Sequence, residues 1–242
     1  MQKRFIYSLA FLGLIFSLSS CSRCLKSTGE IVEQIRFTTD FQELEVWNNV
    51  HLHLDNSLPI NQLVVKAGKN LINQIETSVN NNKLIIRNQN RCHWLRSFEV
   101  RVEVRLNPQN VKNILYQSNG TLKSLQQITI KKLSLKVVLP AIVELNVKAD
   151  TLQLAYQNSS PIQISGEAKY LNIYADGIGL ADAQHCLAQY GKVVHTNINE
   201  VRIAATEKLE VTITHKGTVA YYRKPKELVA RVSPRGRLEA RF

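Results

Sequence analysis

Apolar positions recur along the chain with a period of about 19 residues. The clearest column holds five leucines and skips one copy before its last two members: Leu133, Leu152, Leu171, Leu209 and Leu228. Two residues further on, a second column holds Ile114, Leu135, Leu154, Ile173, Val193, Val211 and Ala230. A third column holds Leu122, Val143, Ile162, Ala181, Val201, Val219 and Leu238. Seven copies of one pattern indicate a repeat protein.

Each copy consists of short strands, because apolar and polar residues alternate inside it. Residues 133–137 and 209–213 show this period of two, which places the apolar side chains on one strand face. Turn-forming residues such as 118–120 and 216–217 separate the strands. A chain that returns to the same phase in every copy stacks its copies parallel and in register. We therefore predict an all-β fold, a parallel β-helix (β-solenoid) of about seven 19-residue rungs. An antiparallel meander is the alternative.

The region before these rungs follows a less regular pattern. Residues 44–52 form a strand, an Asn-containing turn and a second strand, which predicts a first, irregular rung. Strands at 63–66 and 84–86 flank a short helix that we predict around 70–77, with Asn70 as its N-cap. Because the terminal rung of a solenoid exposes apolar surface and unpaired backbone, we expect this small β/α region to cap it.

The first 20 residues have the features of an export signal. Lys3 and Arg4 precede an apolar run at 5–16, interrupted twice, that is too short to span a bilayer. The sequence Leu-Ser-Ser then leads directly to Cys21, as in a bacterial lipobox. We therefore predict a lipoprotein signal peptide at 1–20 and a lipidated Cys21.

Lipidation divides the mature chain into an anchor and a domain. Residues 21–30 are expected to form a lipid-anchored flexible tether, and residues 31–242 the β-solenoid domain. Position 22 is Ser rather than the aspartate that retains many such proteins at the inner membrane, which favours the outer membrane. The periplasmic and the surface side both remain open.

The chain is basic, with a formal net charge of +12. Residues 83–136 contain 11 Lys or Arg and only two acidic residues. From this stretch we predict a candidate binding face of Arg101, Arg105, Lys131 and Lys136. Export argues against nucleic acid and leaves an anionic glycan or an envelope protein as the partner. A solvated strand face without a ligand is the alternative.

Cysteine and histidine give weaker signals. With Cys21 lipidated, three cysteines remain, and Cys92 with Cys186 is the candidate disulfide because Cys24 lies in the tether. His51 and His53 are two apart on a strand and point to one face, but no third metal ligand is near in sequence. We therefore expect no metal and no cofactor.

Parallel β-helices also host polysaccharide lyases and hydrolases, so a catalytic site is an alternative. Such a site needs two or three ionisable groups that converge on adjacent rungs. Glu144 and Asp182 come closest in the predicted register, but they lie two rungs apart. No Ser-His-Asp arrangement or phosphate-binding loop is present. We therefore predict a non-enzymatic binding module, with a polysaccharide-active enzyme and a self-associating structural envelope protein as alternatives.

Several segments resemble one bacterial family, named "putative auto-transporter adhesin, head GIN domain". The resemblance covers roughly residues 28–242 and is carried by these segments and by the rungs with turn glycines: 41–46 leading to 50–52, 69–72 with 75–77, 83–86, and 219–225. The Ser-Gly-Ser-Gly turns of that family appear here in other forms, such as Ser118-Asn119-Gly120. The resemblance implies an exported, often lipid-anchored β-helix with an adhesin label and no established biochemical activity.

Overall fold

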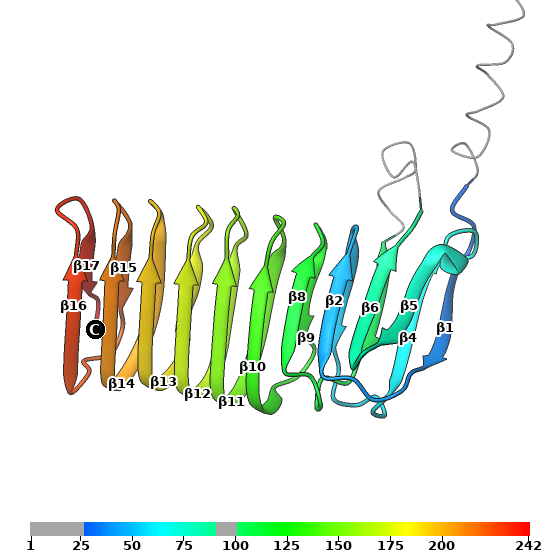
Figure 1. Ribbon diagram of the computed structural model, residues 1–242, viewed down its shortest axis with the longest axis horizontal. Coiled ribbons are helices and arrows are strands. Elements are labelled where there is room, and N and C mark those ends of the chain that lie inside the picture. The colour runs from blue at the N-terminus through cyan, green and yellow to red at the C-terminus, as the bar shows by residue number, and fades with distance from the viewer. Residues whose placement is uncertain (1–26, 91–100) are drawn as a thin grey trace, which may run out of the picture.

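The computed structural model describes residues 27–90 and 101–242, and within them the chain forms a β-solenoid of about seven turns. Strands make up 64% of the described residues and helix 1% (Figure 1). Stacked parallel strands lie about 19 residues apart in sequence. The predicted parallel β-helix is therefore confirmed, and the antiparallel meander is excluded for the regular rungs.

The strands fall into an N-terminal and a regular series. The N-terminal series is β1 (Ile31–Phe37), β2 (Glu43–Trp47), β3 (Val50–Leu54), β4 (Gln62–Gly68), β5 (Ile75–Asn80), β6 (Lys83–Asn88), β7 (Val102–Leu106), β8 (Asn113–Gln117) and β9 (Thr121–Ser124). The regular series is β10 (Ile128–Val137), β11 (Ile142–Tyr156), β12 (Ile162–Ala175), β13 (Ala181–His195), β14 (Glu200–Ile213), β15 (Thr218–Tyr221), β16 (Glu227–Val232) and β17 (Arg237–Ala240).

The strands form one coiled sheet with two faces around a common core. Face 1 has the order β6-β2-β8-β10-β11-β12-β13-β14-β16. Face 2 has the order β7-β3-β9-β11-β12-β13-β14-β15-β17. All of these pairings are parallel. The long strands β11 to β14 belong to both faces, because each bends from face 2 to face 1 at the lower edge in Figure 1.

Strand β11 illustrates one rung. Every second residue from Val143 to Ala149 is buried, and the buried positions then change phase and continue from Leu152 to Tyr156. This phase change marks the bend, since a strand that turns around a core must keep its apolar side chains inward. A turn at residues 157–161 then leads to the next rung.

The three apolar columns predicted from the sequence are continuous ladders. Leu133, Leu152 and Leu171 are register partners, as are Leu209 and Leu228. The second and third columns pair in the same way along face 1 and face 2. Apart from the last rungs, their members are almost completely buried. Each buried Leu, Ile or Val contributes about 1.5–3 kcal/mol, and only a neighbouring rung provides that burial.

Gly191 occupies the position of the skipped leucine. It pairs with Leu171 on one side and Leu209 on the other. A Cβ atom built at Gly191 would meet the side chains of Ala205, Ile203 and Leu209 at 3.0–3.1 Å, so these neighbours fill the space. The adjacent register shifts in β13 allow the ladder to continue past the irregular copy.

The first rung of the sequence is not the first rung of the stack. Strands β2 and β3 lie between the rung of β6 and β7 and the rung of β8 and β9. Leu44 thus joins the ladder between Leu84 and Ile114, and Leu52 lies between Val104 and Leu122. The prediction of an irregular rung at 44–52 is correct, and its expected place at the start of the stack is wrong.

The end of the stack is covered by antiparallel strands instead of the predicted helix. Strand β4 pairs antiparallel with β1 and β7, and β5 pairs antiparallel with β6. The only helix among the described residues is a 3₁₀ turn at Ile72–Gln74, so the helix around 70–77 is wrong. Residues 75–80 are rich in β-branched side chains and form a hairpin with β6, which is the stronger preference.

The N-cap assignment is also corrected. Leu71 occupies the position before the 3₁₀ turn and makes no capping side-chain hydrogen bond. The amide of Asn70 instead donates to the carbonyl of Ser27, which ties the start of the described chain to the cap. Leu71, Ile72 and Ile75 are buried, so the apolar side chains of this segment do complete the core as expected.

Candidate functional site

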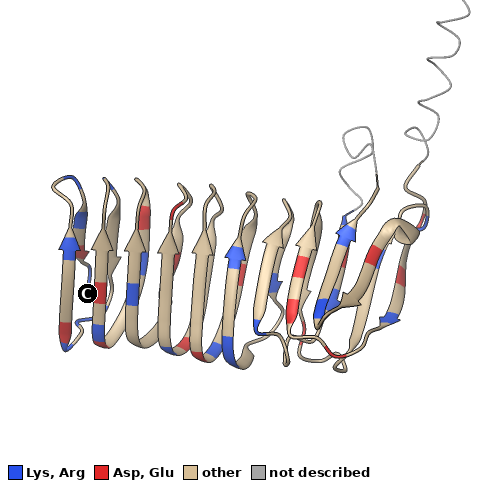
Figure 2. Cartoon of the chain, viewed as in Figure 1, with Lys and Arg blue, Asp and Glu red and all other residues tan. Residues whose placement is uncertain are grey.

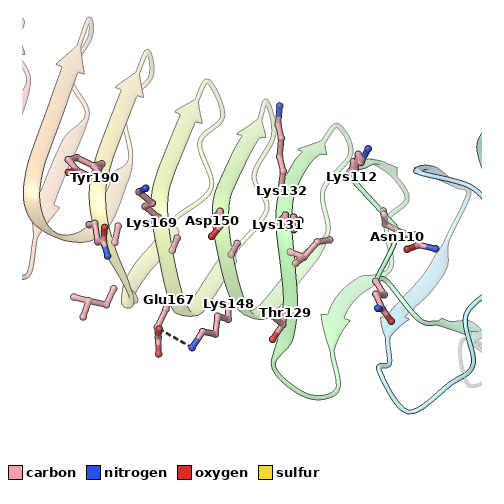
Figure 3. A pocket seen from close by; sticks show the side chains of 18 of the residues that line it. Asn110, Lys112, Thr129, Lys131, Lys132, Lys148, Asp150, Glu167, Lys169 and Tyr190 are labelled. Atoms are coloured by element: carbon pink, nitrogen blue, oxygen red, sulfur yellow. Dashed lines mark ion pairs between the residues drawn. The ribbon is translucent and has the colours of Figure 1, made fainter.

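An open groove follows the lower edge of the solenoid, where the strands bend from face 2 to face 1. We call it the edge groove; it has a volume of about 1050 Å³. Besides Gln42, it is lined by residues from six successive turns of the chain, at 109–112, 129–132, 148–150, 167–169, 187–190 and 206–207 (Figure 3). The groove therefore runs across the strands, along the axis of the stack.

One isoleucine and three alanines form the floor of the edge groove. Ile130, Ala149, Ala168 and Ala188 are register partners on successive strands, and all four are buried. An alanine has no side chain beyond Cβ, so the backbone at the bend lies close to the surface. The repeat therefore produces a shallow floor flanked by the longer residues on either side of each alanine.

Five lysines line the edge groove: Lys112, Lys131, Lys132, Lys148 and Lys169. All five are exposed, and in Figure 3 the side chains of Lys112, Lys131 and Lys132 lie toward the N-terminal end of the groove. They come from the segment before β8 and from the bend of β10, which are adjacent on face 1. The N-terminal end of the groove is therefore the more basic one.

Acidic side chains neutralise only part of this charge. Glu167 is 3.6 Å from Lys148, and Glu207 pairs with Lys226 at 2.8 Å. The remaining acid in the lining is Asp150. Within residues 27–90 and 101–242, the other four lysines of the groove have no ion-pair partner. The edge groove thus has an excess of positive charge without ion pairs among the described residues. Figure 2 shows basic and acidic residues at the bends of the regular strands.

Two stacked tyrosines border the other end of the edge groove. Tyr170 and Tyr190 are register partners on β12 and β13, and their ring centroids are 5.0 Å apart with an interplanar angle of 19°. The rings are 42% and 38% exposed. The ammonium group of Lys169 lies 5.4 Å from the centroid of the Tyr170 ring, within the range of a cation–π contact. The rings stack on each other, so the pair is a partly exposed aromatic cluster.

The structure does not bring the four residues of the predicted binding face together. Lys131 lines the edge groove, whereas Lys136 points outward from face 1. Arg105 is on β7 of face 2, where it pairs with Glu33 at 3.3 Å, and Arg101 lies just before that strand. Counting charge along the sequence combined residues from opposite faces, so their grouping into one face is wrong.

The predicted cysteine roles lie mostly outside the described residues. Cys21 and Cys92 are both in segments that the structure does not describe, so the lipidation and the disulfide remain predictions. Cys186 is in β13 and is fully buried. Burial, together with the carboxylate of Glu167, raises the pKa of its thiol to about 12. A bridge to Cys92 would require access to this interior position.

His51 and His53 are half-buried on the outer side of β3. Burial and neighbouring positive charges, including Lys123, lower the pKa of both imidazoles. The Nδ1 atom of His51 accepts a hydrogen bond from the Thr121 amide at 3.1 Å. Across residues 27–90 and 101–242, no group of three or more His, Cys, Asp or Glu side chains is placed to hold a metal ion.

The carboxylates considered for catalysis lie where the sequence register places them. Glu144 and Asp182 are separated by Gln163 in one outward column, so they are two strands apart. Asp182 forms an ion pair with Arg202 at 3.1 Å. At the strand spacing of about 4.8 Å, the two carboxylates are roughly 10 Å apart, at the upper limit of the separations found in glycan-cleaving enzymes, and Gln163 lies between them.

Sequence reasoning missed most of the edge groove, although a signal existed. Three of its lysines and the two tyrosines that border it lie one or two residues before the first leucine column, as in Lys131-Lys132-Leu133 and Lys169-Tyr170-Leu171. Among the other aromatic residues, Tyr116 and Tyr156 are fully buried in the core. Comparing the polar residues of successive rungs column by column finds the tyrosine pair and Lys131, Asp150 and Lys169.

A family model described as "Putative auto-transporter adhesin, head GIN domain" matches residues 40–225. The chain belongs to this family. This confirms the resemblance carried by the sequence segments named above. The adhesin family to which the chain belongs points to an exported envelope protein, and nothing in the comparisons points to an enzyme. No functionally curated protein matches the chain.

Solved structures of similar proteins share the solenoid fold. A putative adhesin from Bacteroides fragilis has a TM-score of 0.77 and 13% identity, over 88% of this chain and 97% of that one. A putative adhesin from Parabacteroides merdae has a TM-score of 0.67 and 14% identity, over 90% and 99%. A putative lipid binding protein from Parabacteroides distasonis has a TM-score of 0.65 and 15% identity, over 88% and 98%. At these identities the comparison supports the fold alone.

The described part of the head GIN chain, residues 27–90 and 101–242, contains no helix with the length and hydropathy of a membrane span.

Proposed function

We propose that this protein is a non-enzymatic, lipid-anchored module of the cell envelope, an adhesin that binds a glycan, another envelope component or a protein in the edge groove. The observation that carries the proposal is one open groove across six turns of the chain, with unpaired lysines and an exposed tyrosine pair. A groove of this length fits an extended ligand better than a small, enclosed one.

The anchor is the second part of the proposal. Cys21 in its lipobox and the short polar tether at 22–30 would hold the solenoid close to a membrane surface. Several acyl chains at about 0.8 kcal/mol per buried CH₂ bind more firmly than a single myristoyl chain. Ser22 favours the outer membrane as the site of attachment. An envelope ligand would then be within reach of the groove.

The non-enzymatic assignment is supported by the groove itself. Of its three acids, Glu167 and Glu207 form ion pairs with lysines, which leaves Asp150 as the acid that has no ion-pair partner in the part of the chain that the structure describes. Glycan hydrolysis needs two carboxyl groups about 5–10 Å apart with separate roles. Binding a ligand through charge and aromatic contact does not need a carboxyl pair, and it uses the lysines and tyrosines of the groove.

The binding part is tested with the secreted, unlipidated Cys21→Ala protein immobilised on a sensor. Envelope polysaccharides and envelope proteins of the host bacterium are passed over it, in parallel with a Tyr170→Ala/Tyr190→Ala variant. We expect at least one fraction to bind the first protein and to bind the double variant at least tenfold more weakly. Absence of any binding, or equal binding to both proteins, contradicts the proposal.

The anchor is tested in cells. We expect the unaltered protein to carry lipid at Cys21, detected by mass spectrometry of its first peptide, and to sediment with membranes. Cys21→Ala should move the protein to the soluble fraction, whereas Cys24→Ala, a control in the same tether, should leave it with membranes. A membrane-bound Cys21→Ala protein contradicts the lipid anchor.

A further inference from the structure

The charge in the edge groove is unevenly distributed along its length. Lys112, Lys131 and Lys132 lie at the N-terminal end, without ion pairs among the described residues. The middle contains the Lys148–Glu167 ion pair and Asp150, so its charges nearly cancel. An anion therefore gains most at the three-lysine end, where three ammonium groups are free to bind a carboxylate, sulfate or phosphate.

The aromatic surface lies a fixed number of strands from these lysines. Lys132, Thr151, Tyr170 and Tyr190 are successive members of one outward column. At the strand spacing of about 4.8 Å, the backbone at Tyr170 is roughly 10 Å and the backbone at Tyr190 roughly 14 Å from the backbone at Lys132. One sugar unit does not cover that span, but a short oligosaccharide that follows the groove reaches both ends.

The tyrosine pair favours a sugar over a peptide side chain. The two tyrosine rings stack on each other within 19° of parallel, leave part of their aromatic surface in contact with water, and lie beside a row of alanines. The C–H face of a sugar ring covers such a surface and removes it from water. An extended peptide is held mainly through main-chain hydrogen bonds to a free strand edge, and the groove crosses strands that are already paired on both sides.

From this geometry we propose that the edge groove binds an acidic glycan in one direction, with an anionic group at Lys112, Lys131 and Lys132 and a sugar ring on Tyr170 and Tyr190. This rests on the proposed function and adds the class and the orientation of the ligand. Carboxylated and sulfated glycans share the chemistry that the lysines recognise, and separate probes distinguish them.

The test is isothermal titration calorimetry with the Cys21→Ala protein. The probes are oligogalacturonate, the same oligomer with its carboxyl groups methyl-esterified, a sulfated galactan oligomer and poly-glutamate of similar charge. We expect oligogalacturonate or the sulfated oligomer to bind, and the esterified oligomer to bind at least tenfold more weakly than oligogalacturonate if oligogalacturonate is the ligand. Binding should weaken as salt is added, because the attraction is between exposed charges.

Variants then locate the two parts of the ligand. Lys112→Gln/Lys131→Gln/Lys132→Gln should weaken binding at least tenfold and flatten its salt dependence. Tyr170→Ala/Tyr190→Ala should weaken binding without flattening the salt dependence. The control Lys136→Gln/Lys192→Gln/Lys216→Gln removes the same charge from exposed positions outside the groove and should leave binding within twofold.

Other outcomes overturn the inference and separate it from the proposed function. If a neutral glycan binds as tightly as an acidic one, or if poly-glutamate binds equally and independently of the tyrosines, the acidic glycan is wrong while a ligand-binding groove remains. If the control triple variant loses as much affinity as the groove triple variant, general charge explains the binding. If no groove variant affects any binding to the protein, both proposals fail.

Discussion

The regular rungs and the N-terminal rungs reach the same packing by different routes of the chain. In the regular series, strands β11 to β14 each pair with the strand before them and the strand after them in sequence. In the N-terminal series, β2 lies between β6 and β8, and β3 lies between β7 and β9. Yet Leu44 and Leu154 belong to one continuous ladder.

This comparison shows that the apolar ladder sets the register and that the order of the chain does not. A strand with inward Leu, Ile or Val at every second position fits between any two such strands, because each neighbour offers the same surface. The inserted rung is as deeply buried as the regular ones: Leu44 is 1% exposed and Leu154 2%. If burial decides stability, matched substitutions in the two regions should have matched effects.

The largest expected effect comes from truncating a leucine in the apolar ladder that both regions share. Leu44→Ala and Leu154→Ala should each lower the free energy of unfolding by about 2–5 kcal/mol, through lost burial and the remaining cavity. Urea unfolding followed by circular dichroism measures both. Leu228→Ala in the last described rungs, where the side chain is 41% exposed, is the control and should lose less than about 1 kcal/mol. If Leu44→Ala lowers the free energy of unfolding by less than about 1 kcal/mol while Leu154→Ala lowers it by about 2–5 kcal/mol, the inserted rung is packed more loosely than the regular ones.

A somewhat smaller effect is expected at the turn glycines that touch the neighbouring rung. A Cβ at Gly120 would lie 2.4 Å from the Val50 carbonyl oxygen of the inserted rung. At Gly179 it would lie 2.0 Å from the Ser160 carbonyl oxygen. Because backbone must move, Gly120→Ala and Gly179→Ala should each destabilise by about 1–3 kcal/mol. Thermal unfolding measures the stability of both variants. If Gly179→Ala is destabilised and Gly120→Ala is not, the inserted rung and the regular rungs are not packed equivalently.

Each of the two regions contains a buried tyrosine whose hydroxyl donates one hydrogen bond to a carbonyl of a neighbouring segment. Tyr116 donates its hydroxyl to the Val50 carbonyl at 2.7 Å, and Tyr156 donates to the Gly179 carbonyl at 3.1 Å. Tyr116→Phe and Tyr156→Phe should each lose about 1 kcal/mol, the net value of a buried neutral hydrogen bond. The same urea titration resolves this difference. A loss in only one variant would mean that one of the two hydroxyls adds nothing to its rung.

The smallest expected effect is a pH dependence of stability that arises in the N-terminal region, because it depends on two histidines of the inserted strand β3. The pKa of His51 and of His53 is lowered from 6.5 in the folded protein, mainly by burial. Protonation therefore favours the unfolded chain, so their contribution is in place above pH 6.5 and is lost as the pH falls through the folded-state values. His51→Gln/His53→Gln should lose less stability than the unaltered protein between pH 7.5 and pH 5. Equal losses would show that the two imidazoles do not titrate on unfolding.

The repeat made most of the fold predictable, and its limits explain what was missed. Each apolar column could be aligned in advance because period and burial are local properties. The position of Leu44 between Leu84 and Ile114 could not be predicted, because alternating apolar residues predict a strand but not the strands with which it pairs. The helix around 70–77 was wrong because pairing with β6 outweighed a short apolar helical face.

The site was harder to predict than the fold. Lys131 was identified from the charge of its sequence region, but Arg105 and Lys136 were joined to it although they lie on opposite faces. Charge counted along a chain ignores the direction in which each side chain points. Tyr170 and Tyr190 each lie three residues before a member of the second apolar column, so they are found only when the polar residues of successive rungs are compared by column.

The insertion of β2 and β3 has a consequence for biogenesis. A chain exported from its N-terminus delivers residues 43–54 early, but their neighbours on both sides come from residues 83–124. Until Lys83 and the residues after it emerge, these strands have no parallel partner. Assembly of that end must therefore await long-range contacts, which form slowly, whereas each later winding can dock as soon as it appears.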